Sequence, residues 1–224
     1  TAVVGTVSNM SISFGTPVVF ESASTGYKSA TFDSNSNKVV IAYSDGPSGS
    51  DTSRAVVGTV SGTGISFGTP VVFESSEIKY TSVVFDSSNN KIVIAYSDTG
   101  NTEYGTAIVG TVSGTGISFG TAVVFESGNE GAIFTAAAFD TNSNKVVIAY
   151  RHKANSEYGT AIVGTVSGTG ISFGTKVVFN SAESNYMTAT FDSTSNKVVI
   201  AYTDNGNSNY GTAIVGTVSG TNIS

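Results

Sequence analysis

The chain has 224 residues, a formal net charge of −6 and a pI of about 4.6. Only 12% of the residues are charged and none is a cysteine, which argues against nucleic-acid binding and excludes disulfides and thiolate metal sites. No run of about 18 apolar residues occurs, so we expect no membrane insertion.

One short motif recurs along the chain. It begins as Ala2-Val3-Val4-Gly5-Thr6-Val7-Ser8 and returns at intervals of 53, 52, 54 and 52 residues, so repeats start near residues 2, 55, 107, 161 and 213. A fixed period of this length indicates a repeat protein, and we assign residues 1–224 to one repeat domain. The chain starts without Met and stops within a repeat, so we expect it to belong to a longer polypeptide.

Each repeat contains four segments rich in Val, Ile, Phe and Tyr, separated by Gly, Ser, Asn and Asp, as in strands joined by turns. In the second repeat, we predict strands over residues 81–86, 91–97, 106–113 and 117–126. Apolar residues at helical spacing are missing, so helix should be nearly absent. Four such strands match one propeller blade. We therefore predict an all-β fold, a β-propeller of four to five blades or part of a larger array, with an open β-repeat array or solenoid as the alternative.

The order of the strands is the same in every repeat. An aromatic strand ending in Asp is followed by Lys-Val-Val-Ile-Ala-Tyr, by Ala-Ile-Val-Gly-Thr-Val and by Ser-Phe-Gly-Thr-Pro-Val-Val-Phe, with small variations. This order resembles the blades of sialidase-like propellers, and Ser61-Gly62-Thr63-Gly64-Ile65-Ser66-Phe67 is similar to their Asp-box turn without its Asp and with Phe for Trp. The repeats are also similar to arrays in phage fibres and environmental surface proteins. The resemblance implies an adhesin or fibre outside the cell or on a virion surface.

The resemblance does not extend to catalysis. Sialidase-like enzymes hold the substrate carboxylate with three arginines, whereas this chain has only Arg54 and Arg151. No pair of carboxylates is singled out by the sequence for glycosidase chemistry. We therefore expect neither enzyme activity nor a cofactor.

Asp- and Asn-rich segments follow the first strand of each repeat. The segments 33–37 and 140–144 resemble the first half of a calcium loop, but Lys38 and Lys145 stand where such a loop requires glycine, and no glutamate follows at its twelfth position. Asp and Asn also favour tight turns. We predict hairpin turns and no metal site, with calcium binding as the alternative.

Two further patterns concern single side chains. His152, the only histidine, lies between Arg151 and Lys153, which makes a poor metal site and predicts a solvated loop. A tyrosine ends the second strand of every repeat, and we expect these side chains to pack between blades, with a stacking platform for ligands as the alternative. These tyrosines are Tyr43, Tyr96, Tyr150 and Tyr202.

Variation between the repeats is confined to two connections. The turns 86–91 and 113–117 hardly change, but the fourth-to-first and second-to-third connections differ in nearly every repeat. Because strand directions alternate within a blade, both variable connections should lie on one rim. Loops carry recognition more often than strands do, so this rim is the predicted binding site. The variable segments are 23–28, 76–80, 128–134 and 182–186, and 45–54, 98–104, 152–158 and 204–210.

The candidate ligand-binding residues lie in or beside these segments, and their Tyr, Asn and Glu side chains suit a glycan or a surface receptor. We predict a non-catalytic binding module, with a purely structural spacer or filament subunit as the alternative. The strand count does not divide into whole blades, so we expect an unpaired third strand and, with it, self-association or continuation into further sequence. The candidate residues are Tyr27, Lys28, Asp45, Arg54, Lys79, Tyr80, Asp98, Asn101, Tyr104, Glu130, Phe134, Arg151, His152, Glu157, Tyr158, Tyr186, Asp204, Asn207 and Tyr210.

Overall fold

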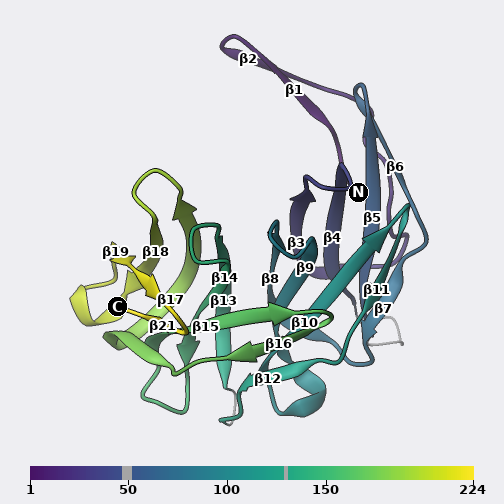
Figure 1. The fold of residues 1–224 in the computed structure, drawn as a ribbon. Helices are drawn as coiled ribbons and strands as arrows, with labels where there is room; N and C mark the ends of the chain where they lie inside the picture. The colour runs from purple at the N-terminus through teal and green to yellow at the C-terminus, as the bar shows by residue number, and fades with distance from the viewer. Residues whose placement is uncertain (47–51, 129–130) are drawn as a thin grey trace.

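The chain folds into a series of antiparallel β-sheets that follow the repeats (Figure 1). The computed structural model describes residues 1–46, 52–128 and 131–224. Helix within these ranges is limited to two 3-10 turns, η1 (Thr99–Asn101) and η2 (Asn205–Asn207). The predicted all-β fold is confirmed. The described residues contain no helix that is long and apolar enough to cross a membrane.

Each complete sheet has the same order of strands. The first sheet contains β3 (Thr25–Asp33), β4 (Lys38–Asp45), β5 (Thr52–Ser61), β6 (Gly64–Phe67) and β7 (Val71–Glu74). The second contains β8 (Ile78–Asp86), β9 (Lys91–Asp98), β10 (Tyr104–Ser113), β11 (Gly116–Phe119) and β12 (Val123–Glu126). The third contains β13 (Ala132–Asp140), β14 (Lys145–His152), β15 (Tyr158–Ser167), β16 (Gly170–Phe173) and the start of β17 (Val177–Asp192). The fourth contains the rest of β17, β18 (Lys197–Asp204) and β19 (Tyr210–Gly216), followed by β20 (Val218–Ser219) and β21 (Asn222–Ile223).

The fourth strand of a repeat is broken in two, which the sequence did not predict. β10 pairs with β11 through Gly110 and Phe119, and with β12 through Ala107 and Val123. Between these two pairs, β10 advances by three residues and the opposite chain segment advances by four. That segment therefore has one extra residue at the break. The prediction of a single strand over residues 117–126 is wrong for this reason.

The first strands of successive sheets lie side by side, β3 next to β8, β8 next to β13 and β13 next to β17. Together they line one open cavity of about 460 Å³, to which each contributes a phenylalanine. The described sheets do not close into a ring or barrel. The four phenylalanines are Phe32, Phe85, Phe139 and Phe191.

The second strands of the first three sheets are buried on both faces. In β9, Ile92, Ile94 and Tyr96 pack into a cluster shared with the first sheet, whereas Val93 and Ala95 pack into a cluster shared with the third. The apolar run of β9 therefore lies between the two neighbouring sheets. The hydrophobic core is thus a set of layers between sheets.

The tyrosine at the end of each second strand packs against a phenylalanine of the preceding sheet. The ring centroids of Phe73 and Tyr96 lie 5.6 Å apart, and those of Phe125 and Tyr150 lie 5.3 Å apart. Tyr43, Tyr96 and Tyr150 are fully buried, and Tyr202 nearly so. The prediction that these tyrosines pack between sheets is confirmed, and they do not form a platform for ligands.

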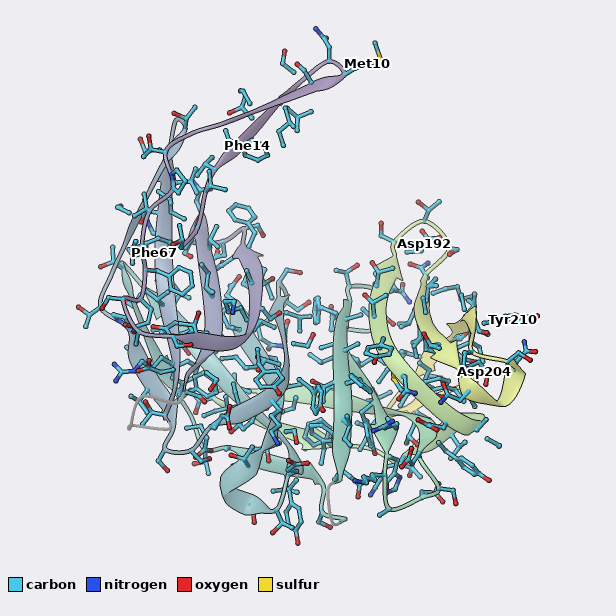
Figure 2. All side chains as sticks on the ribbon, turned by 180° about the vertical axis from the view of Figure 1, so that it is seen from behind. Met10, Phe14, Phe67, Asp192, Asp204 and Tyr210 are labelled. Atoms are coloured by element: carbon cyan, nitrogen blue, oxygen red, sulfur yellow. The ribbon has the colours of Figure 1, made fainter. Side chains whose placement is uncertain are left out.

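One part of the N-terminal segment packs on the first sheet, and another part projects away from it. Phe20 lies 5.2 Å from Tyr43, in the same relation as Phe73 to Tyr96. The hairpin of β1 (Gly5–Ser8) and β2 (Ser11–Phe14) projects away from the sheets, with Met10 and Phe14 exposed (Figure 2).

Candidate functional site

The two variable connections of each repeat lie at the same end of its sheet. In the second sheet, Ile78 at the start of β8 pairs with Asp98 at the end of β9, and Asp98 pairs with Tyr104 at the start of β10. The uniform turns lie at the opposite end. Figure 2 shows this in the last sheet, where Asp192 lies in a turn away from Asp204 and Tyr210. We call the end with the variable connections the variable rim.

Every first strand carries a bulge near the variable rim, and an aromatic residue occupies it. In β8, Lys79 pairs with Ser97 and Ser82 with Ala95, so Tyr80 and Thr81 both face Tyr96. The aromatic residue has a left-handed backbone conformation in all four strands. Glycine usually occupies such a position, because positive φ costs a bulky residue on the order of 1–3 kcal/mol. The φ values are 44° at Tyr27, 51° at Tyr80, 54° at Phe134 and 52° at Tyr186.

These four aromatic side chains form a continuous ladder across the first strands. The ring centroids of Tyr27 and Tyr80 lie 5.6 Å apart, those of Tyr80 and Phe134 4.9 Å, and those of Phe134 and Tyr186 4.7 Å. Tyr186 is 73% exposed and Tyr27 is 39% exposed, while the two central rings are half-buried. The ladder therefore presents apolar ring surface to solvent, a feature that soluble proteins use most often for binding.

Charged side chains flank the ladder as matched pairs. The ammonium of Lys79 lies 2.6 Å from a carboxylate oxygen of Glu103. The hydrogen bond to Glu103 raises the pKa of Lys79, while burial opposes the rise. Lys28, beside Tyr27, donates a hydrogen bond from its ammonium to the carbonyl oxygen of Thr25 at 2.8 Å.

Arg151 lies beside the aromatic ladder at its other half. Its guanidinium lies over the ring of Phe134 at 5.1 Å from the centroid, within the range of a cation–π interaction. The same group lies 3.1 Å from a carboxylate oxygen of Glu183 and 3.5 Å from one of Glu157. A hydrogen bond from Asn185 lowers the pKa of Glu183, so this carboxylate is ionised at neutral pH.

The remaining candidate residues shape the variable rim but lie outside the ladder. Arg54 pairs with Asp45, with 3.0 Å between the guanidinium and the carboxylate. Asp98 and Asp204 cap the 3-10 turns that end at Asn101 and Asn207, each accepting a hydrogen bond from a glycine amide at 3.0 Å. Tyr104, Tyr158 and Tyr210 begin the third strands. Glu130 lies outside the described residues.

His152 is not in a solvated loop, and that prediction is wrong. It ends β14, its side chain is 16% exposed, and its Nε2 lies 3.2 Å from a carboxylate oxygen of Glu126. Glu126 is 3% exposed and also accepts hydrogen bonds from the Tyr150 hydroxyl at 3.0 Å and from the Lys176 ammonium at 2.8 Å. Burial of a carboxylate is costly unless hydrogen-bond donors surround it, which explains why the imidazole packs against Glu126 and does not face solvent.

The histidine should make the stability of the fold decline as the pH falls below about 7. Burial lowers the pKa of His152 below its usual value, although the carboxylate of Glu126 opposes this shift. The unfolded chain therefore binds the proton more readily, and the stability present above the ordinary pKa of 6.5 is lost as the pH falls through the folded-state pKa. Urea titrations should show a free energy of unfolding that declines over this fall in pH, and a smaller decline in His152→Gln. Equal slopes in the two proteins would contradict the assignment.

The aspartate that ends each first strand organises a turn, as predicted. Oδ1 of Asp33 accepts hydrogen bonds from the amides of Asn35 and Ser36 at 2.9 and 3.0 Å, and Asp140 makes the same bonds to residues 142 and 143. Asn37 and Asn144 then adopt positive φ, which asparagine tolerates well. No group of three or more His, Asp or Glu side chains suited to a metal ion occurs among residues 1–46, 52–128 and 131–224.

Two constant features were overlooked in the sequence. An aromatic residue stands six positions before the aspartate in all four repeats, inside a segment that otherwise varies, as Tyr80 does before Asp86. A glutamate follows the phenylalanine of the fourth strand in three repeats, as in Phe125-Glu126. The first feature marks the aromatic ladder and the second marks the carboxylate that accepts the buried tyrosine hydroxyl.

Comparison of the chain with known protein families and with curated proteins gives no match.

Proposed function

We propose that the chain is a non-catalytic binding module that holds a glycan chain on the aromatic ladder. The observation that carries the proposal is the alignment of four aromatic rings in strained backbone positions, one from each repeat. Strain of this kind concentrates at functional sites, because packing alone does not require it.

The chemistry of the ladder suits sugars. A pyranose ring has an apolar face of C–H groups and a polar edge of hydroxyls, and tyrosine offers the matching combination of an apolar body and a hydrogen-bonding hydroxyl. Tyr27, Tyr80 and Tyr186 supply such hydroxyls along the ladder. A linear glycan that crosses the first strands would meet one ring in each repeat, so affinity should rise with the length of the oligosaccharide.

We also propose that the sheets are blades of a propeller-like array. The support for this arrangement is the cavity lined by the first strands of all four sheets. An experimental structure in which these strands do not surround a common axis would contradict it.

The variant Tyr186→Gly tests the ladder. Glycine adopts positive φ without strain, and the tyrosine ring is mostly exposed, so we expect the free energy of unfolding to stay level or rise by about 1 kcal/mol. For polysaccharides that bind the wild type on a glycan array, the affinity should fall about tenfold, which corresponds to about 1.4 kcal/mol.

Tyr210→Gly is the matched control, because Tyr210 is 62% exposed on the same rim but lies outside the ladder. Its binding should equal that of the wild type. A blank glycan array, together with a loss of stability in Tyr186→Gly, would instead favour the alternative of a structural spacer whose aromatic residues only pack.

A further inference from the structure

Carboxylates outnumber cations around the aromatic ladder. The flanking cations among the described residues are Lys28, Lys79 and Arg151. The flanking carboxylates are Glu77, Glu103, Glu157 and Glu183. Since the whole chain also carries a net charge of −6, the field at the ladder repels anions.

The arginines are the groups best suited to bind a sugar carboxylate, because their guanidinium makes paired hydrogen bonds. Both arginines of this chain are already engaged, Arg54 with Asp45 and Arg151 with Glu157 and Glu183. The side chain of Arg151 is only 15% exposed, and a ligand would have to displace the partly exposed carboxylates of Glu157 and Glu183 to reach it. Displacing them would leave the largely buried guanidinium without its carboxylates, which opposes binding of a competing sugar carboxylate.

From this arrangement we infer that the ladder selects uncharged glycans and rejects those that carry carboxylates, such as uronic-acid polymers. The inference rests on the proposed function, because it concerns the same rings. The ion pairs fix the flanks of the ladder and leave ring faces and tyrosine hydroxyls as the groups that a ligand contacts. A neutral sugar chain satisfies these groups, whereas an acidic one brings negative charge to a surface on which carboxylates outnumber cations.

The test is a glycan array that carries neutral polysaccharides beside carboxylated derivatives of the same backbones, such as methyl-esterified and de-esterified polygalacturonate. We expect the wild type to bind neutral members at least about tenfold more tightly than their acidic counterparts, with little change between low and high salt. Stronger binding to the acidic members would overturn the inference but leave the proposed function standing. No binding to either series would remove both.

A gain-of-function variant gives a second readout. Glu103→Gln frees Lys79 from its ion pair while keeping the size of the side chain. Acidic glycans should then bind more tightly than they bind the wild type, by about threefold to tenfold at low salt, while neutral glycans keep their affinity. Thr102→Ser is the matched control in the same turn, and it should leave both series unchanged. An unchanged preference in Glu103→Gln would show that the ion pairs do not set the selectivity.

Discussion

Gly120→Ala should destabilise the fold by about 3 kcal/mol or more, since it forces atoms together where neither can move easily. A Cβ atom on Gly120 would lie 2.0 Å from the carbonyl oxygen of Thr169, which belongs to the turn of the next sheet. The obstacle is backbone, so relief requires the two sheets to separate. Urea unfolding followed by circular dichroism measures the loss.

The matched control is Gly116→Ala in the neighbouring hairpin. Its new Cβ atom would come no closer than 3.6 Å to the Ser113 carbonyl oxygen, and the free energy of unfolding should change by less than about 1 kcal/mol. A small effect at Gly120 would mean that neighbouring sheets are not held at the close distance that the structure shows. The same contact recurs in every repeat, between Gly15 and Thr63, Gly68 and Thr115, and Gly174 and Thr221.

This contact explains part of what the sequence predicted and what it missed. The pattern Phe-Gly-Thr indicated a strand, and β6, β11 and β16 do end at that phenylalanine. The following glycine breaks the strand because the next sheet approaches there, and a contact between different repeats leaves no local signal. The first three strands of a repeat could therefore be predicted, but the division of the fourth strand into two, which gives a complete sheet five strands, could not.

The aromatic ladder shows a similar limit. The variable rim followed from alternating strand directions, and Tyr27, Tyr80, Phe134 and Tyr186 were all among the candidate residues. Their juxtaposition could not be predicted, because an aromatic residue in a strand normally adopts extended backbone, and the bulge that turns it has no glycine to mark it. The constant distance from each aromatic residue to the following aspartate was the only available signal.

The ionic cluster at Glu126 was hidden for another reason. Its members come from three separate strands and loops, and two of them, His152 and Lys176, depart from the residues found in the other repeats. Because Arg151 and Lys153 stand on either side of His152, the sequence suggested a solvated segment. The buried carboxylate on the preceding sheet reverses that expectation, and only the packing of one sheet on the next reveals it.

Glu126→Ala should lower the free energy of unfolding by about 3 kcal/mol, because it leaves the buried Tyr150 hydroxyl and the largely buried His152 imidazole without an acceptor. The Tyr150 hydroxyl is buried and depends on Glu126, as does the imidazole of His152. The carboxylate is ionised at neutral pH: burial opposes this, but the hydrogen bond from Lys176 and its other partners outweigh burial and lower the pKa of Glu126. The loss is measured by urea unfolding at pH 7.

The equivalent variant in the preceding repeat distinguishes the contribution of the ionic cluster from that of the tyrosine–glutamate hydrogen bond, which both repeats share. Glu74 accepts a hydrogen bond from the Tyr96 hydroxyl at 3.3 Å, just as Glu126 does from Tyr150, but the structure places neither a histidine nor a lysine on it. Glu74→Ala should therefore cost only about 1 kcal/mol, because its other hydrogen bonds come from the adjacent Ser75 at an exposed position, where water can replace them. Equal losses at the two positions would show that His152 and Lys176 contribute nothing to the free energy of unfolding at this site. A larger loss at Glu126 that shrinks when Lys176→Met is added would instead assign the difference to the ion pair between Lys176 and Glu126.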